Sequence, residues 1–205
     1  MCWNAEVSFQ SFAIGLIGII VASNTGFSPS MLIFFATIVF MQLIEGIVWT
    51  YGSNPDINFY ASVSAAALLM IQPIASILAI APTSYISPMI ISYIVMGLIT
   101  HLIEHKTDPR SLREQYNMRE EYVGRGVWGR VRLHWKWLDP IPWRSIAVYF
   151  IFLIGPLFLT KQYDFIALVL LTLAISVYSF GKGWGSMWCW IVNLMVIVIC
   201  AKKLF

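Results

Sequence analysis

The sequence predicts an all-α integral membrane protein, a bundle of about seven transmembrane helices, and three observations support this prediction. Apolar residues make up 59% of the 205 residues, and charged residues make up only 11%. Soluble domains carry roughly 25% charged residues, because a globule must cover itself with groups that water solvates. The apolar residues also fall into long stretches separated by short polar breaks, which is typical of a chain that crosses lipid repeatedly.

A membrane-spanning helix needs about 20 mostly apolar residues and satisfies its own backbone groups. Seven segments meet or approach this length: Val7–Ala22, Pro29–Thr50, Ile57–Ala81, Tyr85–Ile103, Ser145–Thr160, Phe165–Phe180 and Trp184–Ala201. The first stretch follows no basic n-region, so we expect a retained span rather than a cleaved signal peptide. Pro73 and Pro156 predict broken helices, like the discontinuous spans of transporters. We expect residues 1–205 to form one bundle domain.

A polar segment, 104–143, separates the fourth and fifth spans. Eight of the thirteen Lys and Arg residues lie in it, and Arg144 follows directly. Short loops rich in Lys and Arg stay on the cytoplasmic side, so we expect a basic and aromatic cytoplasmic insert. The N-terminus is then cytoplasmic and the C-terminus lies on the opposite side. Lys202 and Lys203 are the main evidence against this orientation.

Within the insert, Gly124–Leu138 shows an alternating pattern. Arg130, Arg132, His134 and Lys136 alternate with Val131, Leu133, Trp135 and Trp137. A period of two is typical of a half-buried strand, although Trp128, Val131, Trp135 and Leu138 would also form a helical stripe. The preceding glycines favour extended structure. In either conformation, we expect the aromatic side chains at the bilayer interface and the basic groups facing anionic lipid headgroups or solvent.

Polar residues within the spans are the candidate functional residues, because burying them in lipid is expensive. Glu45 is the clearest case, and Gln42 precedes it by three residues on the same helical face. Gln72 adjoins Pro73, while Cys189 and Asn193 share one stripe of the last span. Together they predict a polar cavity that opens inward. The alternative is that Gln72 and Asn193 only join helices through hydrogen bonds, worth about 0.6 kcal/mol each.

A possible metal site lies at the inner end of the fourth span. His101, Glu104 and His105 form a His-x-x-Glu-His pattern, in which the two histidines share a helical face. Such a pair can bind one zinc ion, with the glutamate as base or ligand, but a hydrolase needs a third protein ligand. Histidines at a helix C-terminus also simply suit the negative end of the helix dipole.

No cofactor is otherwise predicted. A retinal protein needs a lysine in the middle of its last helix, and none lies between Lys182 and Lys202. The inferred orientation is also opposite to that of a rhodopsin, so we argue against retinal. The expected partners are the lipid bilayer, anionic lipid headgroups, a small ion or solute, and further copies of the chain in a homo-oligomer. Nucleic acid is not an expected partner.

Several short motifs resemble a group of uncharacterised multi-pass membrane proteins encoded by giant DNA viruses. They are Met1-Cys2-Trp3-Asn4 with Glu6 and Ser8, Gln42-Leu43-Ile44-Glu45, Gln72-Pro73 and Met187-Trp188-Cys189-Trp190. The resemblance covers the spans but not the cytoplasmic insert. It implies a host or virion membrane as the location, and it implies no catalytic activity.

The sequence leaves three functional hypotheses. The first is a channel or transporter for a small ion or solute, with Glu45 as its charged centre. The second is an intramembrane metal-dependent hydrolase or lipid-modifying enzyme built on His101, Glu104 and His105. The third is a non-catalytic membrane scaffold or receptor, whose interior would hold no water-sized polar cavity. These observations do not decide whether the chain is an enzyme, but they favour a protein without catalytic activity.

Overall fold

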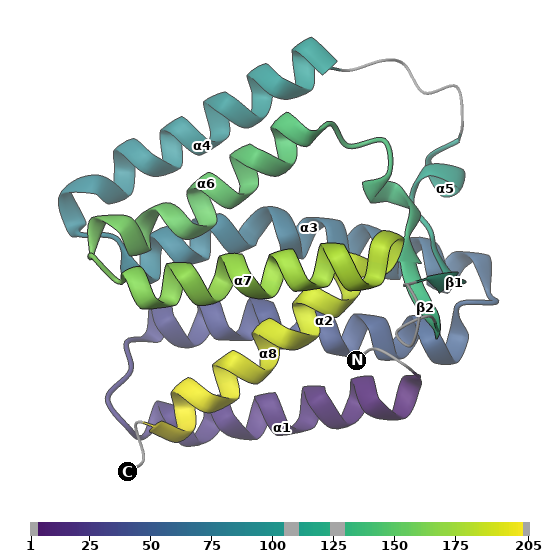
Figure 1. Ribbon diagram of the computed structural model, residues 1–205, viewed down its shortest axis with the longest axis horizontal. Helices are drawn as coiled ribbons and strands as arrows, with labels where there is room; N and C mark the ends of the chain where they lie inside the picture. Colours follow the sequence, from purple (N-terminus) through teal and green to yellow (C-terminus); the bar gives the residue numbers. More distant parts are fainter. Residues whose placement is uncertain (1–3, 105–110, 124–129, 203–205) are drawn as a thin grey trace.

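The computed structural model describes residues 4–104, 111–123 and 130–202 (Figure 1). Its long helices are α1 (Ala5–Ser23), α2 (Pro29–Tyr51), α3 (Pro55–Ile80), α4 (Thr83–Glu104), α6 (Trp143–Leu159), α7 (Tyr163–Phe180) and α8 (Trp184–Lys202). Between α4 and α6 lie α5 (Leu112–Gln115), β1 (Met118–Val123), β2 (Arg130–Trp135) and a 3-10 turn, η2 (Lys136–Leu138). A second 3-10 turn, η3 (Gly181–Gly183), joins α7 to α8. Each long helix begins and ends within two residues of a predicted span, which confirms the all-α bundle.

Local sequence signals explain where the helices begin. The side chains of Asn4 and Ser28 accept hydrogen bonds from the backbone N–H groups of Val7 (2.8 Å) and Met31 (3.3 Å). Asn54 caps α3 in the same way. Proline occupies the first position of both α2 and α3, where its missing N–H costs nothing. Five helical stretches of the described chain are long and apolar enough to cross a membrane, and α6 is a shorter apolar helix.

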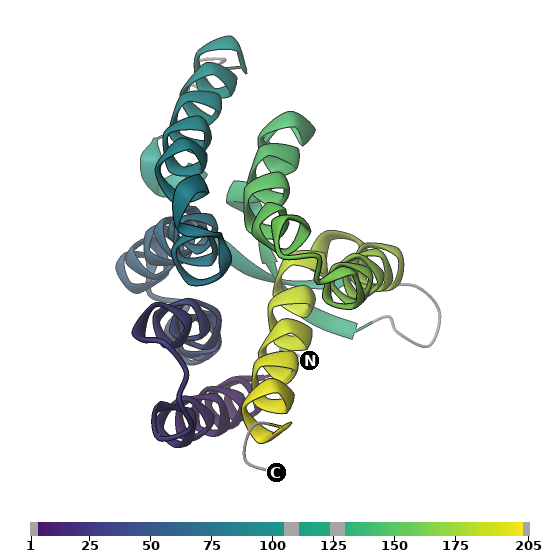
Figure 2. The ribbon, with the colours of Figure 1, turned by 90° about the vertical axis from the view of Figure 1, so that its left-hand side faces the viewer.

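Six helices form a closed ring. In order around it, α1, α2, α3, α6, α7 and α8 each contact the next, and α8 returns to α1. The helix α4 lies outside the ring against α6 and α3, as the two ribbon views show (Figures 1 and 2). No residue of Thr83–Thr100 in α4 is buried. The helix α8 also contacts α2 across the ring, and α4 is a peripheral helix.

The prediction that prolines break two helices is wrong. The helix α3 continues through Pro73, and α6 continues through Pro156. A proline removes one backbone hydrogen bond, but tight packing on the neighbouring helices can hold the helix together. Both prolines are buried inside the bundle, which supplies that packing.

The alternating segment is a strand, as its period of two predicted. The strands β1 and β2 pair in antiparallel register from Met118 opposite Trp135 to Val123 opposite Arg130. The alternative helical stripe is wrong for this segment. Figure 1 shows the hairpin at one end of the bundle, beyond the first turn of α8.

Asn58 near the start of α3 fastens the hairpin to the bundle. Its side-chain amide donates to the carbonyl oxygen of Met118 (2.8 Å) and accepts from the Met118 N–H (2.9 Å). The same amide donates to the Gly52 carbonyl oxygen in the turn before α3 (3.0 Å). One buried side chain thus replaces a missing strand partner for Met118 and links the insert to α3 and to the turn before it.

The expected orientation of the hairpin side chains needs correction. Trp135 and Trp137 are buried against protein rather than facing the bilayer interface, and a Cβ atom at Gly185 would lie 3.1 Å from the Trp135 ring. His134 does not face lipid or solvent, since it is only 2% exposed and its Nε2 atom lies 2.8 Å from Oδ1 of Asp139. The last residues of β2, Leu133 to Trp135, are therefore buried on both faces, because Leu133 and Trp135 pack in the core and the following turn brings Asp139 to His134.

Candidate functional site

All five predicted pathway residues are buried. Their exposed fractions run from zero to 4%: Gln42, Glu45, Gln72, Cys189 and Asn193. Tertiary structure nevertheless divides them between different surroundings. Gln72 and Cys189 line one cavity, whereas Gln42, Glu45 and Asn193 are not among the described residues that line it.

Glu45 and Gln42 lie together in the second half of α2. The amide Nε2 of Gln42 lies 3.4 Å from Oε2 of Glu45, so the two side chains are in contact as their spacing of three residues predicted. Both side chains are wholly shielded from solvent. Gly46 follows directly and packs against the Phe9 ring of α1, so α1 and α2 are in close contact at this level.

Asn193 joins α8 to α1. Its Nδ2 atom donates to the backbone carbonyl of Ser11 (3.1 Å), and Trp190 donates from its indole nitrogen to the Ser11 hydroxyl (3.0 Å). This is the helix-joining role that the sequence left as an alternative for Asn193. Ser11 lies far from Trp190 and Asn193 in the sequence, so only the folded structure could identify it as their hydrogen-bond partner.

Gln72 joins three helices at the middle of the ring. Its Nε2 atom donates to the Thr37 carbonyl oxygen of α2 (3.1 Å), and its Oε1 atom accepts from the Tyr149 hydroxyl of α6. One turn later, the Ser76 hydroxyl donates to the Leu153 carbonyl oxygen of α6 (2.8 Å). Ser76 was not predicted, although its place four residues after Gln72 on the same helical face was a usable signal.

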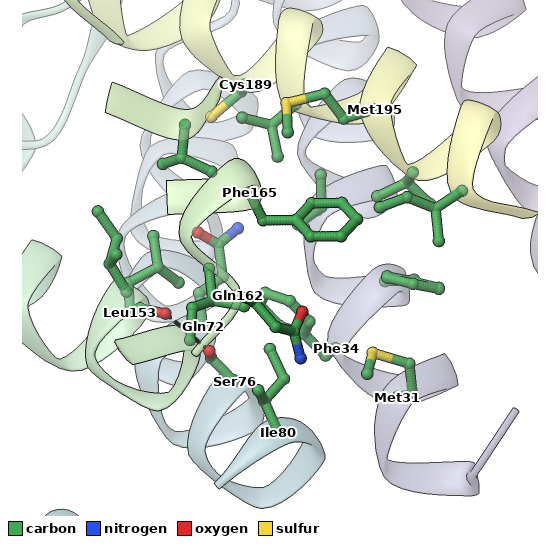
Figure 3. A pocket seen from close by; sticks show the side chains of 18 of the residues that line it. Met31, Phe34, Gln72, Ser76, Ile80, Leu153, Gln162, Phe165, Cys189 and Met195 are labelled. Carbon is green, nitrogen blue, oxygen red and sulfur yellow. Dashed lines mark hydrogen bonds between the residues drawn. The ribbon is translucent and has the colours of Figure 1, made fainter. Parts of the chain in front are cut away.

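A cavity of about 290 Å³ lies between α2, α3, α6, α7 and α8. Apolar side chains of all five helices supply most of its wall, and Figure 3 shows Phe34, Phe165 and Met195 around it. Its polar lining residues include Gln72, Ser76, Cys189 and Gln162. Gln72 and Ser76 already hydrogen-bond to protein, so they offer little to a polar ligand. The wall is therefore suited to an apolar one.

The cavity lies toward the end of the ring that is opposite the hairpin. Phe27, Ile80, Gln162 and Ile199 line it, and each belongs to the turn or helix end at that side. Gln162 is exposed and its amide points into the cavity (Figure 3). We call this end, with the turn between α6 and α7, the mouth of the cavity.

The predicted metal site falls largely outside the described residues. His101 and Glu104 belong to the last turns of α4, but their side chains are not described, and His105 lies outside the described residues altogether. Among the residues that are described, no group of three His, Cys, Asp or Glu side chains could hold a metal ion.

No family model, curated protein or solved structure matches this chain. The chemistry of the site therefore rests on the geometry of the ring and its cavity.

Proposed function

We propose that the chain is an integral membrane protein that binds the apolar tail of a lipid-like molecule within its ring of helices. The observation that carries this proposal is the largely apolar cavity of about 290 Å³ between five of the helices. Ligand cavities typically have volumes of about 300 to 1,000 Å³. This cavity is at the lower limit, which suits one hydrocarbon chain better than a two-chain lipid.

The outer surface of the bundle supports placement in a membrane. Every long helix exposes large apolar side chains, for example Ile17, Ile33, Met70, Leu98, Ile151, Leu171 and Val198. In water, apolar surface costs roughly 25 cal/mol per Å², so a surface of this kind is favourable only against lipid or another apolar partner. Helices satisfy their own backbone groups and can therefore face hydrocarbon.

The distribution of charge supports an orientation. The hairpin end carries Arg113, Lys136, Arg144 and Lys182 among its described residues. The positive-inside rule puts this end in the cytoplasm, together with the N-terminus. The mouth of the cavity and the C-terminus are then on the opposite side of the membrane.

An apolar chain fits the cavity better than a small ion does. An ion would lose its hydration shell on entry, and the protein must replace the lost contacts with polar groups. The described wall offers few such groups, and Gln72 and Ser76 are committed to helix–helix hydrogen bonds. Transport of an ion through Glu45 and Gln42 stays a prediction, since these residues do not line the described cavity.

The test replaces a cavity residue by a larger one. Met195 lines the cavity, whereas its neighbour Leu194 is exposed and is not a described lining residue. We expect Met195→Trp to reduce photolabelling by an uncharged alkyl alcohol with a diazirine in its tail by about tenfold, equivalent to about 1.4 kcal/mol of binding. Leu194→Trp is the matched control and should label like the unmodified protein.

Mass spectrometry of the labelled peptides supplies the second readout. The label should fall on α8 and α6 residues that line the cavity. If Met195→Trp labels as strongly as Leu194→Trp while both proteins stay folded by circular dichroism, the cavity is not the binding site.

A further inference from the structure

The turn at the mouth has an unusual residue at its tightest position. Gln162 N–H donates to the Leu157 carbonyl oxygen (2.9 Å), and Lys161 N–H donates to that of Phe158 (3.1 Å). These two hydrogen bonds define a Schellman motif at the end of α6. The motif puts Lys161 in the left-handed region, with φ of 57°. Glycine is the usual residue there, because a side chain raises the energy of this conformation.

Lys161 is the only non-glycine residue with positive φ in the described part of the chain. Strained backbone positions cluster at functional sites, so an observed outlier suggests a function for its side chain. Here the side chain supplies a positive charge, is exposed, and makes no ion pair with any described residue. Lys161 directly precedes Gln162, whose amide points into the cavity (Figure 3).

One acidic side chain lies nearby. Asp164 is exposed in the first turn of α7, where a carboxylate is favoured by the helix dipole. It occupies a different face of α7 from Phe165 and Val169, the residues of that helix that line the cavity. Lys161 and Asp164 are therefore the described charged residues next to the lining residues Gln162 and Phe165, and of the two only Lys161 can attract a negative head.

We propose that the natural occupant of the cavity is a single-chain anionic amphiphile. Its hydrocarbon tail would lie among the apolar side chains, and its carboxylate or phosphate head would contact Lys161 and the Gln162 amide at the mouth. The volume admits one chain, and the exposed lysine complements a negative head at the end of the bundle. This inference rests on the proposed function, because it needs the cavity to bind a tail.

The experiment measures competition against the uncharged diazirine alcohol in the full-length protein. Three competitors share one dodecyl chain and differ in the head: carboxylate, phosphate or trimethylammonium. We expect the anionic competitors to be at least fivefold more effective than the cationic one. The better of the two anionic heads identifies the source, a fatty acid or a phosphorylated lipid.

Substitutions assign that preference to Lys161. Lys161→Gln should abolish the preference for anionic heads, and Lys161→Arg should retain it. Lys182→Gln, which removes a charge at the hairpin end, is the matched control and should retain it as well. Lys161→Gly should also abolish the preference while raising the unfolding temperature, because glycine relieves the strain in the turn.

The outcomes separate the two proposals. If anionic and cationic competitors are equally effective and Met195→Trp still loses labelling, the proposal of an anionic head group is wrong. The proposal that the cavity binds a hydrocarbon tail is then still supported. An anionic preference that survives Lys161→Gln overturns the role of Lys161. Labelling that neither competitors nor Met195→Trp reduce overturns the proposed function itself.

Discussion

Small residues bring α1 close to its neighbours. The buried residues of α1 are Ser8, Ser11, Gly15 and Ala22. Small side chains allow close backbone approach, which drives helix association where lipid removes the hydrophobic difference between faces. At Gly15 the approach is closest, because a Cβ atom there would lie 2.8 Å from Oδ1 of Asn193 and from a methyl group of Val39.

Gly15→Leu tests this contact. The added side chain must displace Asn193 and Val39, so we expect a loss of about 1 to 3 kcal/mol in unfolding free energy, as for other overpacked sites. Tryptophan fluorescence during thermal unfolding in detergent would measure the change. Gly97→Leu on α4 is the control, because nothing lies within 4 Å of a Cβ atom there. Equal stability of the two variants would contradict close packing at Gly15.

At the scale of elements, the hairpin is held to the ring by a small number of contacts. Asn58 satisfies both backbone groups of Met118, and the buried tryptophans of β2 and η2 pack on the end of the bundle. Trp135 and Trp137 stack on each other, with ring centroids 5.6 Å apart. The hairpin is therefore part of the folded bundle rather than an independent unit.

Asn58→Ala should loosen this element. It leaves two buried backbone groups of Met118 without a partner, which costs about 1 to 3 kcal/mol for each group left unsatisfied. We expect faster hydrogen exchange at the β1 and β2 amides than in the unmodified protein. Asn24→Ala serves as control, since the Asn24 amide donates only to the carbonyl of Ile20 in its own helix. Unchanged exchange in Asn58→Ala would show that the aromatic packing alone holds the hairpin.

At the scale of the whole molecule, the two ends of the ring differ in chemistry. The hairpin end carries most of the described basic side chains, and the mouth end carries Lys161, which directly precedes the cavity-lining residue Gln162. This asymmetry predicts a fixed orientation in the membrane, with the hairpin end in the cytoplasm.

Cysteine labelling in sealed microsomes tests that orientation. The cytoplasmic face of the membrane is on the outside of these vesicles, so a membrane-impermeant maleimide reacts only with cysteines on that face. In a protein without its native cysteines, Ser53→Cys in the α2–α3 turn should label at once. Asn24→Cys in the α1–α2 turn should label only after detergent is added. Both positions are exposed in the folded chain. The reverse pattern would invert the topology, and immediate labelling of both would argue against a span between them.

The sequence by itself determined the helices and the strand. A span needs about 20 apolar residues whatever surrounds it, so helix ends could be located to within two residues. The alternation from Arg130 to Trp135 likewise favoured an extended segment over the helical stripe that the same region allowed, because side chains on a strand repeat every two residues. Glu45 and Gln42 could be paired because they lie on one helix.

Only the tertiary structure decided which helices meet and where the cavity lies. These helices are apolar on nearly every side, so their sequences do not specify which face turns inward. The bonds of Gln72 to Thr37 and Tyr149, and of Asn193 to Ser11, join residues far apart in the chain. For the same reason, the sequence placed Glu45 and Cys189 in one polar cavity, whereas the helix rotations put only Cys189 on the wall of a largely apolar one.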